Sequence, residues 1–195
     1  MSRHEVGPHA RGESLFIADL PDPPGTLHAA ILVSPVPHGR ILRLDTSPAA
    51  GMSGVACILT AADIPGANQI GGIVQDEPLL AEGVVHFVGQ PIAVVVADTP
   101  RRARAAAAAI ALELEELPAV FDPRAAAAAG ELIVPSRTLA CGDVDAAWAD
   151  CPVVVSGRAD SGGQEHLYLE TQTALTIPQG GGRLRILSST QAPTA

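Results

Sequence analysis

The amino-acid sequence predicts an α+β protein, and three observations carry that expectation. Hydrophobic residues make up 47% of the 195 positions and the mean hydropathy is +0.27, which favours a buried core over disorder. Short apolar or alternating runs separated by Gly and Pro are typical of strands. Two alanine-rich stretches that follow Thr-Pro and Asp-Pro are typical of helices. This length suffices for one domain, or for a small domain and part of another.

The chain divides into three expected segments. Residues 1–12 are polar and punctuated by Gly and Pro, so we expect a flexible lead-in. A unit over 13–120 carries most of the strand patterns, and a second unit covers 121–195. Within the first unit, three strands are expected near its start: 27–33, 40–45 and 55–59.

Local signals punctuate these strands. Ser47 is expected to cap a short helix with Pro48 at its first position, and Thr60 to cap a turn that ends at Pro65. Residues 67–82 have no strong periodicity. They predict a long connection that is either functional or a packed loop.

The middle of the first unit predicts two more strands and a helix. The runs 84–88 and 92–97, separated by Gly-Gln-Pro, predict paired strands, the second central because it is apolar on both faces. A helix is expected from Thr99, its N-cap, to Ala109. The alternation at 112–115 then predicts a strand. Its glutamates could form a paired-carboxylate site, but a solvated strand face is the favoured interpretation: Glu113, Glu115 and Glu116.

The second unit begins with helix signals and ends with strand signals. Asp122 and Asp143 are expected N-caps of helices that end near Gly130 and Trp148, and neither needs a metal. Strands are expected over 153–158, 167–177 and 183–187. The glycine-rich turn at 178–182 predicts a hairpin, because no phosphate-loop pattern surrounds it.

Composition excludes several function classes. The net charge of −9, with no Lys, argues against binding to a nucleic-acid backbone. No apolar run approaches the roughly 18 residues of a membrane span, and no signal peptide is recognised, so a cytoplasmic protein is expected. The cysteines lack zinc or iron–sulfur spacing and are expected to be buried free thiols in a reducing compartment: Cys57, Cys141 and Cys151. Three histidines at strand ends are interpreted as structural: His28, His38 and His86.

One nine-residue run, GGQEHLYLE at 162–170, concentrates chemistry. Gly162 and Gly163 allow a ligand to approach the backbone closely, because they lack a Cβ. Gln164 offers an uncharged donor and acceptor, which suits recognition of an oxo group or a pterin edge better than proton transfer. In a strand, Gln164, His166 and Tyr168 would share one face. The alternative is a half-exposed strand with a polar rim.

Several motifs resemble, in order and spacing, the molybdenum-binding subunits of the xanthine dehydrogenase/aldehyde oxidase family. The resemblance covers residues 12–191. Its segments are GESLF at 12–16, ADLP at 18–21, PGTLHA at 24–29, SPVPHGRI at 34–41, LTAADIPG at 59–66, FVGQPIAVVVA at 87–97, EELP at 115–118, GDVDAA at 142–147, GGQEH at 162–166 and SSTQ at 188–191.

The resemblance implies an α/β-hammerhead domain over 13–120, followed by the incomplete start of a molybdopterin-binding domain over 121–195. It also implies purine hydroxylation, with electrons passing through iron–sulfur clusters and FAD on other domains or subunits to NAD. Gln164 matches the glutamine that lies against the oxo ligand of molybdenum, beside Gly162 and Gly163. No residue of this chain is implied as a direct metal ligand or as a catalytic group.

The sequence also departs from the family pattern. Leu167 replaces the usual Phe, Ala18 stands where an acid is common, and Ala192 replaces a frequent His. The family's general-base glutamate, cofactor-contacting glycine-rich segment and substrate-binding arginine have no counterpart here, so we expect a truncated subunit without turnover on its own. Two alternatives remain open: a non-catalytic assembly module of a multi-subunit complex, and a subunit of an aldehyde-oxidising relative.

Overall fold

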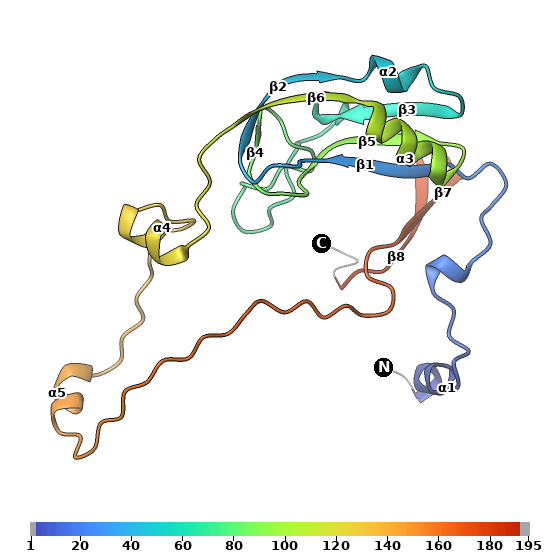
Figure 1. The fold of residues 1–195 in the computed structure, drawn as a ribbon. Helices are drawn as coiled ribbons and strands as arrows, with labels where there is room; N and C mark the ends of the chain where they lie inside the picture. The colour runs from blue at the N-terminus through green and yellow to red at the C-terminus, as the bar shows by residue number, and fades with distance from the viewer. Residues whose placement is uncertain (1–2, 192–195) are drawn as a thin grey trace. The chain divides into compact units, whose positions relative to one another are not determined.

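The computed structural model describes residues 3–191 and confirms the α+β class (Figure 1). The chain forms two compact units. One comprises residues Pro24–Arg137. The other combines Met1–Pro23 with Thr138–Ala195, so the first unit is inserted within the second along the chain.

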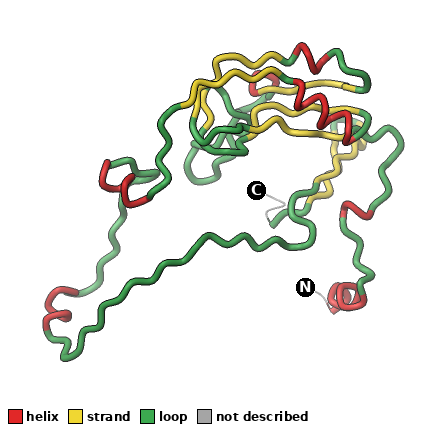
Figure 2. Tube along the Cα trace, viewed as in Figure 1, coloured by secondary structure: helices red, strands yellow, loops and turns green. Residues whose placement is uncertain are grey.

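The unit Pro24–Arg137 contains two antiparallel three-stranded sheets, which Figures 1 and 2 show as arrows and as yellow segments. In the first sheet the strand order is β1-β5-β3, and in the second it is β4-β2-β6. β5 is therefore central, as its two apolar faces predict. The strands are β1 (His28–Val33), β2 (Gly39–Asp45), β3 (Val55–Thr60), β4 (Val84–Val85), β5 (Pro91–Ala97) and β6 (Ala111–Glu116).

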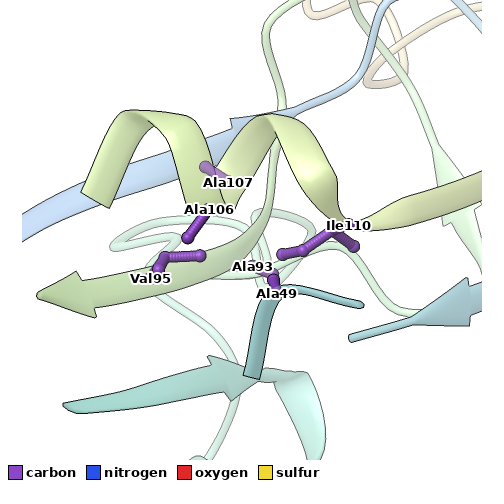
Figure 3. Packing of buried hydrophobic residues seen from close by; sticks show 6 residues of the cluster. All are labelled: Ala49, Ala93, Val95, Ala106, Ala107 and Ile110. Atoms are coloured by element: carbon purple, nitrogen blue, oxygen red, sulfur yellow. The ribbon is translucent and has the colours of Figure 1, made fainter. Parts of the chain in front are cut away.

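The helix α3 (Pro100–Ala109) packs on β1 and β5 through alanines (Figure 3). Its start is the predicted one: the Thr99 hydroxyl accepts a hydrogen bond from the backbone N–H of Arg102 at 3.3 Å. Methyl-sized side chains let the helix backbone approach the sheet closely. The resulting cluster of buried residues consists of Ala49, Ala93, Val95, Ala106, Ala107 and Ile110.

A second buried cluster links the two sheets through β5. Ile92 is fully buried and packs with Val85 of β4 and with Ala81. Partly buried residues of β2 and β6 complete the cluster: Ile41, Leu44, Leu112 and Leu114. The alternation in β6 therefore works as predicted, with leucines inward and glutamates exposed. Arg40 of β2 pairs with Glu115 across the strands at 2.6 Å.

The predicted pairing of 84–88 with 92–97 is wrong. β4 covers only Val84–Val85 and pairs with β2, whereas β5 pairs with β1 and β3. Gln90 explains the difference. Its side chain is 2% exposed, and its Oε1 accepts a hydrogen bond from the His86 N–H at 2.6 Å. The side chain thus satisfies a donor that a strand partner would otherwise take, and the segment crosses from one sheet to the other.

The cap of the short helix α2 (Ser47–Ala50) also differs from the expectation. Ser47 lies inside the helix, and the N-cap residue is Thr46 without a side-chain cap. Asp45 replaces that function, because its Oδ1 accepts a hydrogen bond from the Ser47 N–H at 3.0 Å. The turn η2 (Ala61–Asp63) follows Thr60 as predicted, and Asp63 accepts hydrogen bonds from both the backbone and the hydroxyl of Thr60 at 2.8 Å.

The connection 67–82 is a packed loop held by two side-chain amides. Asn68 donates to the Leu80 carbonyl at 2.8 Å and accepts from the Leu80 N–H at 3.0 Å. Gln69 Oε1 accepts from the N–H groups of Gly71 and Glu77, both at 2.8 Å. These hydrogen bonds close the loop at its base, as one of the two alternatives expects, and a function of the segment stays a prediction.

Both aspartate-capped helices are confirmed. Asp122 accepts from the N–H of Arg124 at the start of α4 (Pro123–Ala129), and Gly130 closes this helix with a left-handed φ of 76°. Asp143 accepts from the Ala146 N–H at 2.9 Å at the start of α5 (Val144–Ala149).

The described part of residues 1–12 is helical, and the flexibility of this lead-in stays a prediction. The helix α1 (Arg3–Arg11) continues through Pro8 and ends at Gly12, whose φ is 70°. The Glu13 N–H donates to the Pro8 carbonyl at 2.8 Å. Gly12 thus forms a left-handed C-terminal cap, in which the Glu13 N–H satisfies a carbonyl of the last helical turn. The turn η1 (Ile17–Asp19) follows.

The strands of the C-terminal part differ from the prediction at its start and agree with it at the hairpin. The hairpin of β7 (Ala174–Gly180) and β8 (Arg183–Ser188) is confirmed, with left-handed glycines at its turn. Residues 150–173, all of them described, contain neither helix nor strand, as the long loop in Figure 2 shows. The strand predicted over 153–158 is therefore absent, and the one over 167–177 forms only from Ala174. An extended segment needs a pairing partner to count as a strand, and the positive φ of Leu167, 44°, interrupts this one.

Cys57, Cys141 and Cys151 are free, as expected, but all three are exposed rather than buried. Cys57 lies on the β3 edge of the first sheet, and the other two flank α5, which has no buried residue. No helix in the described part of the chain is long and apolar enough to span a membrane.

Replacing Ile92 by Ala should destabilise the chain by about 2–5 kcal/mol, because the change leaves a cavity between the two sheets. Urea unfolding of the full chain followed by circular dichroism measures this loss. Ile73→Ala, at a side chain that is 100% exposed, is the matched control and should change the stability little. Equal midpoints for the two variants would contradict the assigned core.

Asp63→Asn should remove part of the acid dependence of stability. The hydrogen bonds from Thr60 lower the pKa of Asp63 below its ordinary value of 3.8. A lowered folded-state pKa means that the stabilisation is present above pH 3.8 and is lost as pH falls through the folded pKa. Stability curves from pH 2 to pH 6 should be flatter for this variant than for Asp76→Asn, an exposed control. Identical slopes would contradict the role of the cap.

Candidate functional site

The residues singled out by sequence, Gly162, Gly163 and Gln164, lie in the extended segment before the β7–β8 hairpin. All three are exposed. No described atom lies within 4 Å of a Cβ added to either glycine. Both positions therefore leave open space beside the backbone, which a ligand could approach.

The predicted sharing of one strand face by Gln164, His166 and Tyr168 is not observed. The segment has no strand partner, and the positive φ of Leu167 turns the chain between His166 and Tyr168. The structure therefore does not gather these side chains into one constellation. They share a segment, and each is exposed.

Charged residues around this segment are paired locally. The Arg158 guanidinium donates to both carboxylate oxygens of Asp160, at 2.7 and 2.9 Å, and this contact raises the pKa of Arg158. Glu165 Oε1 accepts from the His166 N–H at 2.9 Å. The residue that follows Gln164 in sequence, Glu165, therefore has its carboxylate engaged by a backbone N–H. Among the described residues, no group of three or more His, Cys, Asp or Glu side chains could hold a metal ion.

Glu170, the last residue of the run, makes a contact that sequence reasoning missed. Its Oε1 accepts a hydrogen bond from the Ala18 N–H at 2.9 Å, across 152 positions of the chain. Ala18 lies in η1, whose start is also held by the hydrogen bond from the Phe16 N–H to Asp19 Oδ2. A carboxylate at the N–H groups of a helical turn is favourable. No local signal in the sequence pointed to this contact, because the two residues are 152 positions apart.

A cleft of about 610 Å³ opens beside this contact, within the unit that holds both chain ends. It is lined by His9, Gly12, Ser14, Phe16, Ala18, Asp19, Leu169, Glu170, Thr171 and Thr173. The cleft adjoins the C-terminal end of the GGQEHLYLE run, and its lining mixes hydroxyl, carboxylate and apolar groups. It does not include Gln164.

The unit Pro24–Arg137 has a separate cleft of about 450 Å³ around two histidines. The His38 and His86 rings stack with centroids 5.9 Å apart, and His38 Nδ1 lies 2.6 Å from the Pro118 carbonyl oxygen. The contact to Pro118 fits the structural role expected for His38, because it ties the start of β2 to the end of β6.

Comparison with protein families identifies both parts of the chain. The family model for the aldehyde oxidase and xanthine dehydrogenase a/b hammerhead domain matches residues 11–118. The model for the molybdopterin cofactor-binding domain matches residues 128–195, which include the GGQEHLYLE run. The bounds 13–120 and 121–195 stay predictions at the level of single residues.

Individual relatives and solved structures agree with these matches. Xanthine dehydrogenase 1 of Arabidopsis thaliana is 45% identical over 93% of this chain, and aldehyde oxidase 2 of Cavia porcellus is 38% identical over 95%. The chain spans 14% of the length of each. Quinoline 2-oxidoreductase from Pseudomonas putida 86 superimposes with a TM-score of 0.79 at 31% identity, covering 98% of this chain and 26% of that one. Aldehyde oxidoreductase from Desulfovibrio gigas gives 0.81 at 32%, covering 93% and 22%. The chain thus belongs to the xanthine dehydrogenase and aldehyde oxidase family of molybdenum hydroxylases, and comprises its hammerhead domain and part of its molybdopterin cofactor-binding domain.

Proposed function

We propose that this chain supplies one wall of the cofactor site in a molybdenum hydroxylase that oxidises purines. The observation that carries the proposal is the position of the GGQEHLYLE run inside the part of the chain that matches the molybdopterin cofactor-binding domain. The 45% identity to a plant xanthine dehydrogenase supports a purine as the substrate. In this proposal Gln164 lies against the oxo ligand of molybdenum without ligating the metal, beside Gly162 and Gly163.

The Gln164 side chain and the two glycines fit a molybdenum-bound pterin chemically. A terminal oxo ligand accepts hydrogen bonds, and the Gln164 amide can donate one without adding a charge or a labile proton. The open space at both glycines, where no atom lies within 4 Å of an added Cβ, would let the backbone approach a bulky pterin. The segment is exposed along its length, so the remaining walls have to come from other polypeptide.

The cofactor, when bound, would supply the two-electron oxidation and the oxygen transfer to an electron-poor carbon of the substrate. The residues of this chain would bind and orient it. Gln164 would donate to the oxo ligand, and the glycines would admit the pterin. Glu170 would hold the end of the segment through its hydrogen bond to Ala18. None of these residues would move a proton, so turnover requires an acid–base group from elsewhere.

The same proposal assigns the other redox groups to other domains or subunits. The three cysteines of this chain lack the spacing of an iron–sulfur motif and are one fewer than the four thiolates that usually hold a cluster. Iron–sulfur clusters and FAD would therefore be bound by the remaining polypeptide. The larger oligomeric complex would pass electrons through them to NAD. No nucleic acid or membrane partner is proposed, and a cytoplasmic location stays a prediction.

An aldehyde-oxidising activity is the second candidate. It is favoured by the 38% identity to an aldehyde oxidase and by the structural likeness to an aldehyde oxidoreductase. The family's substrate-binding arginine has no counterpart in this chain, so substrate choice would lie outside it. Both candidates share the cofactor and the role of Gln164.

A chimera tests the assignment. The corresponding stretch of Arabidopsis thaliana xanthine dehydrogenase 1 is replaced by this chain, which aligns with it over 186 residues. We expect the chimera to bind molybdenum stoichiometrically and to oxidise xanthine faster than an aromatic aldehyde, whereas this chain alone should do neither. A folded chimera without molybdenum would contradict the cofactor role. A preference for the aldehyde would favour the second candidate.

Within the active chimera, Gln164→Ala should lower kcat by about tenfold to a hundredfold, because it removes one oriented donor at the site. Gln179→Ala, an exposed glutamine in the hairpin β7, is the matched control and should leave kcat unchanged. Molybdenum content measured on the same samples separates loss of the cofactor from loss of rate. Either loss supports contact with the group, and full retention of both kcat and molybdenum would overturn the role of Gln164.

A further inference from the structure

β1 forms an open edge of the first sheet. The strand order β1-β5-β3 places it at the outside, with β5 as its partner on one side. Alternate residues of an edge strand direct their N–H and C=O groups away from the sheet. Residues 29–33 read AAILV, so two devices that usually protect an edge, a charge and a proline, are absent, and the one irregularity in the pairing of this strand with β5 lies between Leu32 and Val33. Ile31 and Val33 are exposed on this strand.

A groove of about 570 Å³ runs along this edge, between β1 and α3. Residues 29–33 form one wall, and the flank of α3 forms the other with Arg104, Ala107 and Ala108. The alanines leave the space that larger helix residues would fill. A helix beside an open edge strand is the arrangement in which an added strand can also insert side chains.

Arg104 gives the groove its charge. Arg104 is exposed, and no ion pair to it exists among the described residues. Arg102, on the same helix, pairs with Asp98 instead. The other lining groups are apolar side chains and the backbone of β1. An occupant with a carboxylate near Arg104 would complement this wall.

We propose that the β1–α3 groove binds an extended segment of another polypeptide, which adds to β1 as an extra strand. Its backbone pairs with the outward N–H and C=O groups of residues 29–33. Alternate apolar side chains enter the groove against Ala107 and Ala108, and an acidic side chain pairs with Arg104. Backbone pairing provides the affinity, and the acidic residue sets the register.

A second copy of this chain fits the groove less well. Antiparallel pairing of two β1 strands requires a two-fold axis perpendicular to the sheet, and this axis puts both α3 helices on the same face. The two Arg104 side chains would then line the same face with like charge and without an acid between them. The charge therefore favours an acidic partner over self-association.

The test uses the full 195-residue chain and the probe peptide fluorescein-Gly-Val-Thr-Val-Glu-Val-amide, followed by fluorescence anisotropy. The proposal expects saturable binding. N-methylation of one alternate set of peptide amides should abolish binding, because one edge of the peptide faces β1, and N-methylation of the other set should not. Absence of binding, or equal binding of both methylated peptides, would overturn strand addition.

Charge reversal tests the register. Arg104→Glu should weaken binding of the acidic probe about tenfold, and a probe with Lys in place of Glu should recover it. Arg101→Glu lies on the same helix outside the groove, and it should leave the affinity unchanged. Equal losses of affinity in the two variants would show that Arg104 acts only through the overall charge of the helix, and would overturn its assignment to the groove. Sedimentation that shows dimers which the probe peptide dissociates would instead assign the groove to a second copy.

Discussion

Close packing of α3 on the central strand β5 is the constraint on which the unit Pro24–Arg137 depends. The buried residues of the helix are Ala103, Ala106 and Ala107. The buried residues of β5 in the same cluster are Ala93 and Val95. Small side chains on both surfaces bring the two backbones together, so many dispersion contacts stabilise a core cluster that contains no aromatic residue. The other sheet is joined to this core by Ile92, which belongs to the same strand. One strand thus serves two cores.

The candidate site has the opposite character. The GGQEHLYLE run is exposed along most of its length, and a long-range hydrogen bond from the Ala18 N–H to Glu170 holds its end. A segment of this kind contributes little to the stability of the chain by itself. Its conformation near Gln164 is therefore open to selection by whatever polypeptide and cofactor complete the site.

Local chemistry in the sequence predicted those parts of the fold that depend on neighbours along the chain. A cap or a turn involves only a few consecutive residues, so its sequence signal is local. The sequence correctly predicted the caps at Thr99, Asp122 and Asp143, the helix end at Gly130 and the glycine-rich hairpin. The central position of β5 was readable from its apolar faces. Family resemblance, rather than periodicity, identified the hammerhead and cofactor-binding parts.

The errors in the strands share a physical cause, which is pairing between distant residues. Nothing local in residues 153–158 or 167–173 shows whether a partner strand is present, and both stretches were predicted as strand. The buried amide of Gln90 was hidden for the same reason, since its burial follows from a crossover between two sheets. The exposure of the cysteines depends equally on which neighbours cover them. For the site, the sequence indicated the segment but not its lack of strand structure or its anchor at Glu170.

The hydrogen bond between Ala18 and Glu170 has a consequence for the order of folding. The two halves of one compact unit are separated by an insertion, so the contacts of the first half have very high sequence separation. During synthesis, η1 leaves the ribosome 152 positions before its partner carboxylate. The inserted unit is complete once residue 137 has been synthesised, so it can fold before the first 23 residues find their partners. Its folding then shortens the effective loop that joins the two halves, and so reduces the entropy cost of closing the surrounding unit.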